Sequence, residues 1–148
     1  MKIIQATTNE IEVLAKLFDE YRVFYEKPSD INGARNFLKE RISNGESIAF
    51  IAYDVDNNPM GFTHLYPLFS STRMARFWLL NDLYVNPQYR KLGVGEALLE
   101  RAKQLVKDSN ACGMMLETAS DNIPAQNLYL KNGWEKDNGH YYFSWDNA

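Results

Sequence analysis

The stretch QYRKLGVGEALLERA, residues Gln88–Ala102, places two glycines two residues apart, after a basic pair and before a segment of helical periodicity. Glycine lets the backbone approach a ligand closely, and the N–H groups at the start of a helix attract anions. The stretch therefore predicts a phosphate-binding loop that contains Arg90, Lys91, Gly93 and Gly95.

Two common phosphate-binding motifs do not fit this loop. A P-loop requires the pattern G-x-x-x-x-G-K-[ST], and no Lys-Ser or Lys-Thr pair follows these glycines. A dinucleotide-binding fingerprint requires a third glycine where this chain has Leu98, and no acidic residue ends a long second strand at the expected place. The pattern that remains is R-x-x-G-x-G, between a predicted strand and a predicted helix.

Runs of apolar and aromatic residues, bounded by turn residues, predict the strands of a sheet. The predicted strands are KIIQA at 2–6, SIAFIAYD at 47–54, FTHLYPLF at 62–69, ARFWLLNDLYV at 75–85, MMLETA at 114–119, GWEK at 133–136 and HYYFSW at 140–145. With the helices between them, the order is β-α-α-β-β-β-α-β-α-β-β. This order predicts an α/β fold with a mixed sheet covered by helices.

Helical spacing of apolar residues predicts the helices. The residues with this spacing are Ile11, Leu14, Phe18, Tyr21 and Tyr25 in the first helix, Phe37, Leu38, Arg41 and Ile42 in a shorter second one ending near Gly45, Leu98, Ala102, Leu105 and Val106 in the third, and Ala125, Leu128 and Tyr129 in the fourth. Asn9 is expected to cap the first helix, with Glu12 as in a capping box. The segment KPSDING at 27–33 is expected to break it. Pro124 suits the first turn of the fourth helix, and Gly133 its end.

Composition and charge restrict the functional class. The chain has 148 residues, 45% of them hydrophobic and 24% charged, which is typical of a single globular domain over 1–148. A net charge of −3 argues against a general nucleic-acid binder and fits a cationic partner better. The single Cys112 excludes an internal disulfide and offers no zinc cluster. Without a membrane-length apolar run or a signal peptide in MKIIQATTNE, we expect a cytoplasmic enzyme that needs no metal.

Two segments beside the loop make the prediction more specific. NDLYVNPQYR precedes the glycines at 81–90, and SDNIPAQNLYLKNGW follows at 120–134. With the R-x-x-G-x-G pattern between them, the chain resembles the GNAT superfamily of acyl-CoA-dependent N-acetyltransferases over most of its length. The strand LNDLYV at 80–85 is similar to that of the subgroup acting on histones and polyamines. The resemblance implies the GNAT fold, a central and mostly antiparallel sheet flanked by helices.

The resemblance also implies acetyl-CoA as co-substrate, with its pyrophosphate at the loop that Arg90 begins. The backbone N–H groups expected to hold the pyrophosphate are those of Lys91, Leu92, Gly93, Val94, Gly95 and Glu96. Lys91 departs from the family pattern, because many relatives have a glycine there. It still donates its N–H and adds a positive charge near the phosphates.

Further family roles are implied for the strand before the loop and the helix after it. Leu83, Tyr84 and Val85 would offer edge N–H and C=O groups to the pantetheine arm and to the thioester carbonyl, which becomes an oxyanion during acyl transfer. Asn122 matches the asparagine that binds the pantetheine arm. Tyr129 matches the tyrosine whose hydroxyl protonates the departing CoA thiolate.

The general base is less well defined. An alkyl amine with a pKa of about 10.4 is almost entirely protonated at neutral pH, so its proton must be accepted before attack. Asp82 is the best candidate by position, although polyamine-acetylating relatives often have a glutamate one place earlier, where this chain has Asn81. Asp82 could therefore only attract the cation, with water accepting the proton. Glu26 and Asp30 could line the acceptor entrance or be solvated loop charges, and Glu117 is a further candidate.

Structural roles compete with catalytic ones at several positions. An isolated tyrosine on an apolar helix face, as at Tyr129, is usually a core residue, and the loop glycines would also fit a turn with a close helix–strand contact. His64 is interpreted as a satisfied strand histidine rather than a catalytic one. Cys112 is interpreted as a small buried hydrophobic residue, and His140 receives no role.

The resulting prediction is an N-acetyltransferase that acts on a primary amine by direct attack in a ternary complex. The expected acceptor is a small cationic amine (a polyamine or lysine-like amine) or a protein lysine or N-terminus. The alternative is a non-catalytic acyl-CoA-binding sensor or interaction module, which would not need Tyr129, so the tyrosine favours the enzyme. The family and the aromatic C-terminal segment predict a homodimer, and we expect no nucleic-acid or membrane partner.

Overall fold

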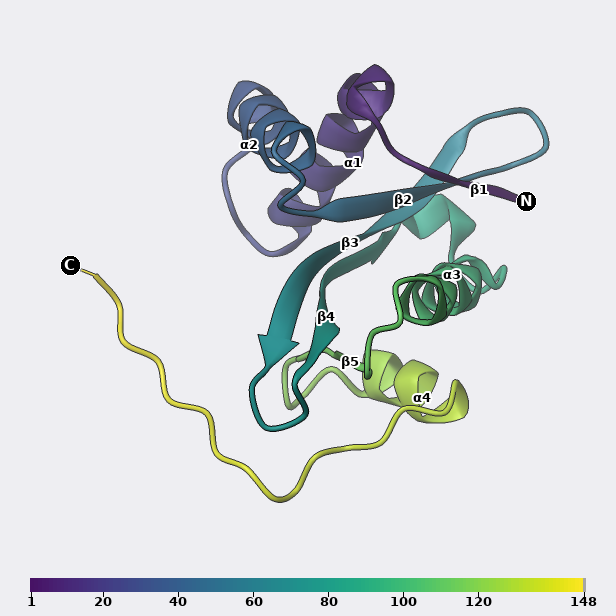
Figure 1. The fold of residues 1–148 in the computed structure, drawn as a ribbon. Helices are drawn as coiled ribbons and strands as arrows, with labels where there is room; N and C mark the ends of the chain where they lie inside the picture. The colour runs from purple at the N-terminus through teal and green to yellow at the C-terminus, as the bar shows by residue number, and fades with distance from the viewer. Residues whose placement is uncertain (148) are drawn as a thin grey trace. The chain divides into compact units, whose positions relative to one another are not determined.

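The computed structural model describes residues 1–147 in two parts, residues 1–117 and the residues from Thr118 on. The first part contains a five-stranded sheet with the order β1-β2-β3-β4-β5 (Figure 1). Its strands are β1 (Lys2–Gln5), β2 (Ile48–Tyr53), β3 (Pro59–Ser70), β4 (Ala75–Val85) and β5 (Met114–Met115). Neighbours from β1 to β4 are antiparallel, and β5 is parallel to β4. The predicted mixed, mostly antiparallel sheet is confirmed.

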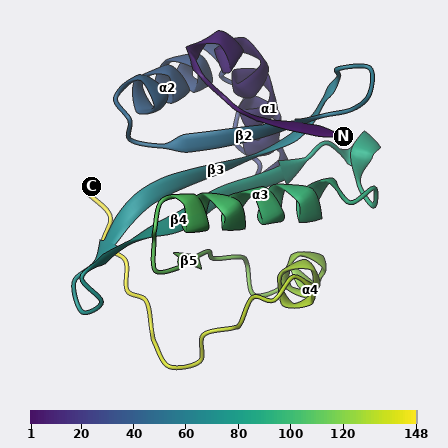
Figure 2. The same cartoon turned by 45° about the vertical axis from the view of Figure 1, so that its right-hand side comes forward.

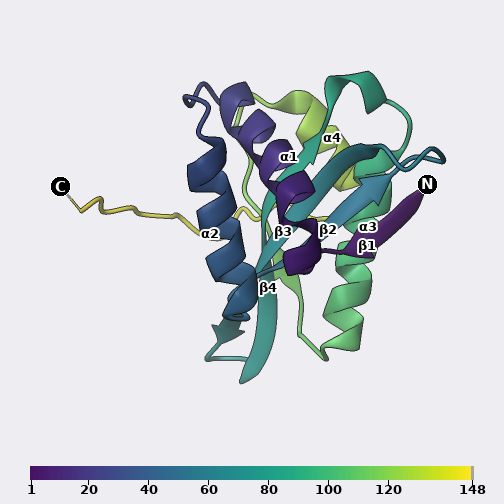
Figure 3. The ribbon, with the colours of Figure 1, turned by 90° about the horizontal axis from the view of Figure 1, so that it is seen from above.

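Helices cover both faces of this sheet. In the first part they are α1 (Ile11–Phe24), α2 (Ile31–Ser43) and α3 (Val94–Asp108). The α1 and α2 helices lie on one face and α3 on the other (Figures 2 and 3). Leu14 of α1 and Phe62 of β3 are fully buried in the core between α1, α2 and the sheet. On the other face α3 buries Leu98 and Ala102, two of the residues whose spacing predicts this helix.

The first helix is capped differently from the prediction, because a short 3₁₀ turn, η1 (Thr8–Glu10), precedes α1. Thr7, not Asn9, caps this turn: its Oγ1 accepts the Asn9 N–H at 3.2 Å. Oε2 of Glu10 accepts the Thr7 N–H at 2.7 Å, which completes a capping box. Glu12 takes no part in it. The capping box therefore lies two residues earlier in the chain than its predicted position.

The second part contains α4 (Ile123–Lys131), and Gly133, the predicted stop, follows the C-cap residue Asn132. Gly133 has a φ of +84°, a backbone conformation that favours glycine. The Trp134 N–H donates to the Tyr129 oxygen at 3.0 Å, and the Gly133 N–H donates to the Leu130 oxygen at 3.2 Å. These two bonds satisfy carbonyl groups of the last helical turn. None of the helices within residues 1–147 is both long and apolar enough to cross a membrane.

The two strands predicted after α4, at 133–136 and 140–145, are wrong, since no described residue of this segment has strand structure. Asp137 instead accepts local hydrogen bonds, from the Gly139 N–H at 2.8 Å and from His140 Nδ1 at 2.7 Å. Aromatic side chains favour strands, but a strand forms only where a partner edge supplies its hydrogen bonds. The strand preference of these aromatic residues was therefore insufficient to form a strand.

Candidate active site

The C-terminal half of β4 contains a bulge. In the pairing with β3, His64 faces Asp82 and Leu65 faces Leu80, so Asn81 is an extra residue on β4. A bulge of this kind bends the strand and changes the direction of its side chains, and bulges are frequent next to active sites. The irregularity lies within the segment LNDLYV.

The opposite edge of β4 is unpaired over the same residues. β5, predicted at 114–119, is reduced to Met114–Met115 and pairs with Trp78 and Leu79. In the first part of the structure, Leu80–Val85 therefore have no strand on this side. Unpaired N–H and C=O groups of an edge strand can bind an extended ligand. The predicted pantetheine-binding residues on this edge are Leu83, Tyr84 and Val85.

Asp82 is buried, and other side chains already hold its carboxylate. Oδ2 lies 3.1 Å from Nδ1 of His64 and accepts a hydrogen bond from Nδ2 of Asn81 at 3.2 Å. His64 is fully buried, and its second ring nitrogen, Nε2, has no hydrogen-bond partner. The prediction of a satisfied histidine is therefore correct for Nδ1 and wrong for Nε2.

A short 3₁₀ turn, η2 (Pro87–Tyr89), connects β4 to the glycine loop. Oδ1 of Asn86 caps the turn by accepting a backbone N–H at 3.0 Å, so the strand ends at Asn86-Pro87 as predicted. Arg90 Nε donates to the Val85 oxygen at 3.1 Å, and its guanidinium lies 5.1 Å from the ring centroid of Phe24. The Arg90 side chain therefore attaches the loop to the end of β4 and to α1.

Lys91 and Gly93 both have left-handed backbone conformations, with φ values of +63° and +80°. A glycine adopts this conformation without strain, whereas Lys91 has a side chain there. Gly93 is the N-cap residue of α3, and no side chain at this position caps the first N–H groups of the helix. Gly95 lies inside the helix without a positive φ, so any requirement for glycine there concerns space.

Comparison with known protein families identifies the family of this chain. The sequence profile of the Acetyltransferase (GNAT) family matches residues 14–134, which include β4, the glycine loop and α4. The chain belongs to the GNAT acetyltransferase family. It is therefore an acetyl-CoA-dependent acyltransferase, as the loop and its flanking segments predicted.

Relatives of similar length agree with this GNAT assignment. The chain is 43% identical over 143 residues to the uncharacterized N-acetyltransferase YhfO of Bacillus subtilis (strain 168), which covers 97% of this chain and 95% of that protein. A probable acetyltransferase of Haemophilus influenzae is 31% identical over 121 residues, 82% of this chain and 83% of that one. The crystal structure of a probable acetyltransferase has a TM-score of 0.95 at 36% identity, covering 100% of this chain and 99% of that one. The GNAT fold is confirmed.

Two predicted GNAT site residues lie in the second part of the structure. Asn122 is the N-cap of α4, and its Oδ1 accepts the Ala125 N–H at 3.2 Å. Tyr129 is half-buried on α4, with its ring centroid 6.1 Å from that of Trp134. No residue of α4 is fully buried within the described part that contains it. The approach of both residues to the β4 edge stays a prediction.

The other acidic candidates for the acceptor side of this GNAT site have separate positions. Asp30 caps α2 by accepting the Gly33 N–H at Oδ1, 2.9 Å away, so the helix begins inside the segment predicted to break it. Glu26 is exposed in the turn after α1, with a φ of +63°. Glu117 is exposed at the end of the first part. A structural role is therefore established for Asp30 only.

Glu20 of α1 is a charged neighbour of the β4 edge that the sequence did not single out. It accepts a hydrogen bond from Nδ2 of Asn86 at 3.4 Å. Burial, followed by the charge of Glu20, raises the pKa of Tyr84 above its ordinary value. No local signal identifies Glu20, because its contact with Asn86 joins residues that are 66 positions apart.

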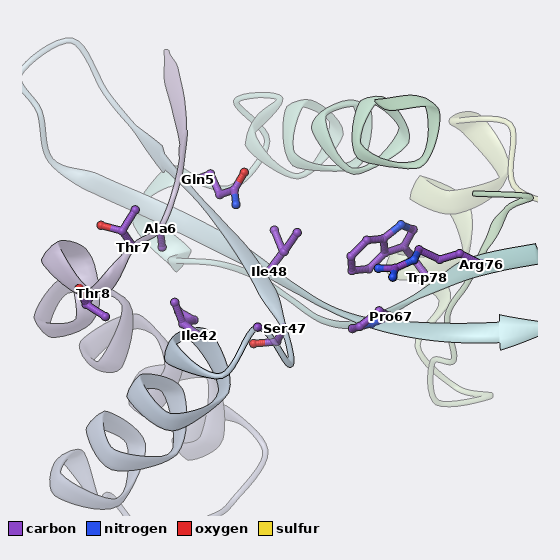
Figure 4. Close-up of a pocket in the computed structure, with 11 residues that line it drawn as sticks. Gln5, Ala6, Thr7, Thr8, Ile42, Ser47, Ile48, Pro67, Arg76 and Trp78 are labelled. Carbon is purple, nitrogen blue, oxygen red and sulfur yellow. The ribbon is translucent and has the colours of Figure 1, made fainter. Parts of the chain in front are cut away.

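A cavity of about 450 Å³ lies elsewhere in the first part (Figure 4). Gln5, Ser47, Ile48, Arg76 and Trp78 are among its lining residues. None of the predicted site residues lines it. The candidate site is therefore the β4 edge with the glycine loop, and not this cavity.

Proposed function

We propose that this GNAT enzyme transfers the acetyl group of acetyl-CoA to a primary amine, by direct attack of the amine in a ternary complex. The proposal depends on one observation: the unpaired edge at Leu80–Val85 is followed directly by a loop that leads to the uncapped N-terminus of α3. An extended molecule with a pyrophosphate at one end fits backbone hydrogen bonds along its arm and an anion site at its end. When bound, acetyl-CoA supplies an activated acyl group.

Backbone N–H groups and one ammonium group would form the anion site. The residues that would supply the N–H groups are Lys91, Leu92, Gly93, Val94, Gly95 and Glu96. A helix N-terminus stabilises an anion by about 0.3–1 kcal/mol, and by up to about 2 kcal/mol where it is partly buried. The ammonium group of Lys91 would add to this attraction. Arg90 would contribute by holding the loop against β4.

The β4 edge would hold the pantetheine arm and the acyl oxygen. The backbone groups would come from the segment Leu83, Tyr84 and Val85, of which alternate residues face this edge because β4 also pairs with β3. Negative charge develops on the acyl oxygen during transfer, and a fixed N–H donor stabilises it without reorganisation. The bulge at Asn81 supports this role, because it changes the direction of the backbone shortly before Leu83.

Asn122 and Tyr129 would complete the site from α4. Since Oδ1 of Asn122 caps the helix, its Nδ2 would donate to the pantetheine arm. The Tyr129 hydroxyl would give its proton to the departing thiolate. We propose that residues 1–148 therefore work as one GNAT domain, which agrees with a family match that extends across both described parts.

We propose a cationic acceptor, either a small polyamine or lysine-like amine or a protein lysine or N-terminus. A buried carboxylate at Asp82, beside the unpaired edge, and a net charge of −3 favour a cation. Two more distant relatives have names that place the acetyl group on a nitrogen. They are the thialysine N-epsilon-acetyltransferase of Caenorhabditis elegans, 26% identical over 107 residues, and the aminoglycoside N(6')-acetyltransferase type 1 of Stenotrophomonas maltophilia, 23% identical over 109 residues.

Free-thiol release from acetyl-CoA tests the proposal, with matched cationic and neutral amines as acceptors at two salt concentrations. We expect faster release with the cationic amines and a smaller advantage at high salt, because salt screens the attraction. Equal rates without salt dependence would exclude the cationic acceptor. If the protein binds acetyl-CoA but none of the amines causes it to release free thiol, transfer to an amine is excluded.

We also propose that the enzyme is a cytoplasmic homodimer. The single cysteine fits a reducing compartment. Four large aromatic side chains near the C-terminus are between 73% and 96% exposed, which suits burial against a second copy: Tyr141, Tyr142, Phe143 and Trp145. Sedimentation equilibrium tests the dimer, and a monomer at all concentrations would exclude it.

A further inference from the structure

A buried histidine of β3 and a buried aspartate of β4 form a pair beside the β4 bulge. His64 Nδ1 and Asp82 Oδ2 are 3.1 Å apart, and their side chains are 0% and 7% exposed. Asn81, the bulge residue, donates to the same Oδ2. Both hydrogen bonds therefore end on one oxygen of the carboxylate. Among residues 1–147, no hydrogen bond from another side chain ends on its Oδ1.

The surroundings of His64 determine which ring nitrogen has the proton. Nε2 is buried without a partner, so a proton there would leave an N–H group unsatisfied. A proton on Nδ1 faces the Asp82 carboxylate instead. The tautomer with its proton on Nδ1 is therefore favoured over the tautomer with its proton on Nε2.

Aromatic rings pack against the His64 side of this pair. Phe18 of α1 meets the His64 ring edge-on, with centroids 6.4 Å apart, and the Tyr66 ring is 4.9 Å away. Burial, followed by the charge of Asp82, raises the pKa of Tyr66 to about 12, and Arg41 opposes this shift. Tyr66 therefore keeps its proton at physiological pH, and the Asp82 carboxyl is the acidic group that His64 faces.

We propose that His64 is a positioning residue for the amine acceptor. Its Nδ1–H, together with Asn81, fixes Oδ2 of Asp82, so that Oδ1 receives an N–H of the cationic amine. Without these donors the carboxylate would rotate, and the amine would lose its fixed partner. This inference depends on the proposed amine acetylation, and it adds a residue that never touches the acceptor itself.

The tautomer is measured first, by long-range ¹H–¹⁵N correlation spectra of the whole protein. The chain has two histidines, and His140, exposed and paired with Asp137 at 2.7 Å, is the matched control. A His140→Gln variant assigns both rings. We expect the neutral His64 ring to have its proton on Nδ1. A proton on Nε2 would overturn the proposal, whatever the enzyme's activity.

Kinetics then test the positioning role. His64→Asn keeps an N–H donor near the position of Nδ1, whereas His64→Leu removes it. We expect His64→Leu to raise the KM for the cationic amine roughly ten- to a hundredfold, with acetyl-CoA affinity within about twofold of the parent. His64→Asn restores most of the loss, and His140→Gln shows none. Acetyl-CoA affinity, measured by calorimetry, verifies that each variant is folded.

A double-variant cycle connects the effect to Asp82. In an Asp82→Asn background, His64→Leu should change the KM for the amine less than about twofold, because it acts through the same carboxylate. Additive losses, or a parental KM in a His64→Leu protein that binds acetyl-CoA, would refute the role of His64. Failure of the parent to acetylate any amine would refute the proposed function instead, while the tautomer spectrum still tests His64 alone.

Discussion

The Nε atom of Arg90 donates a hydrogen bond to the backbone oxygen of Val85, at 3.1 Å, across the turn that joins β4 to the glycine loop. The first residue of the R-x-x-G-x-G pattern therefore connects the two backbone regions proposed to bind acetyl-CoA. Its guanidinium also lies against the Phe24 ring, so the side chain is held at two points.

Replacement of Arg90 tests this connection. Arg90→Ala should weaken acetyl-CoA binding roughly three- to tenfold, because the loop loses one hydrogen bond and its attachment to β4. Lys103→Ala is the control, since it removes a positive charge from α3 at a residue paired with Glu100. Calorimetry measures both affinities. An equal loss of acetyl-CoA affinity in the two variants would mean that Arg90 contributes to binding through its positive charge alone.

Replacement of Lys91 by glycine is expected to stabilise the protein. The Lys91 φ of +63° strains a side-chain-bearing residue, so Lys91→Gly should raise the free energy of unfolding by about 0.5–1 kcal/mol. Lys103→Gly, in the interior of α3, should lower it by about 1 kcal/mol. Urea denaturation compares the two variants. A lower stability for Lys91→Gly would show that the left-handed conformation is not a source of strain.

The two loop glycines should respond differently to substitution. Gly95→Val should abolish acetyl-CoA binding in a folded protein, because its side chain occupies space at the helix N-terminus where the phosphates must approach. A Cβ at Gly93 meets no atom within 4 Å, but its φ of +80° disfavours alanine. Gly93→Ala should therefore cost about 1 kcal/mol of stability. Retained acetyl-CoA affinity in Gly95→Val would exclude the proposed anion site.

Tyr129 is tested by removal of its hydroxyl. Tyr129→Phe keeps the ring beside Trp134 and should lower kcat roughly 10²–10⁴-fold, nearer the lower end because a thiolate is a good leaving group. Acetyl-CoA binding should change little. Tyr142→Phe is the control, since Tyr142 is 73% exposed. Turnover of Tyr129→Phe within about twofold of the parent would return Tyr129 to a packing role.

Local signals determined much of the fold from the sequence alone. β4 has the predicted bounds, Ala75–Val85, because an apolar and aromatic run is stopped by Asn86-Pro87. α4 stops shortly before Gly133, as predicted, because a glycine there adopts the left-handed conformation at no steric cost. The R-x-x-G-x-G pattern likewise located a loop with positive φ values before α3. Each of these features depends on residues close together in the chain.

Features that depend on strand pairing were decided only by the tertiary structure. The bulge at Asn81 and the contact between His64 and Asp82 require the register of β3 against β4, which joins residues 18 positions apart. Strand preference at 140–145 was insufficient because no partner edge pairs with this segment in the described structure. A backbone hydrogen-bond ladder needs two strands, and the sequence of one segment does not specify its partner or its register.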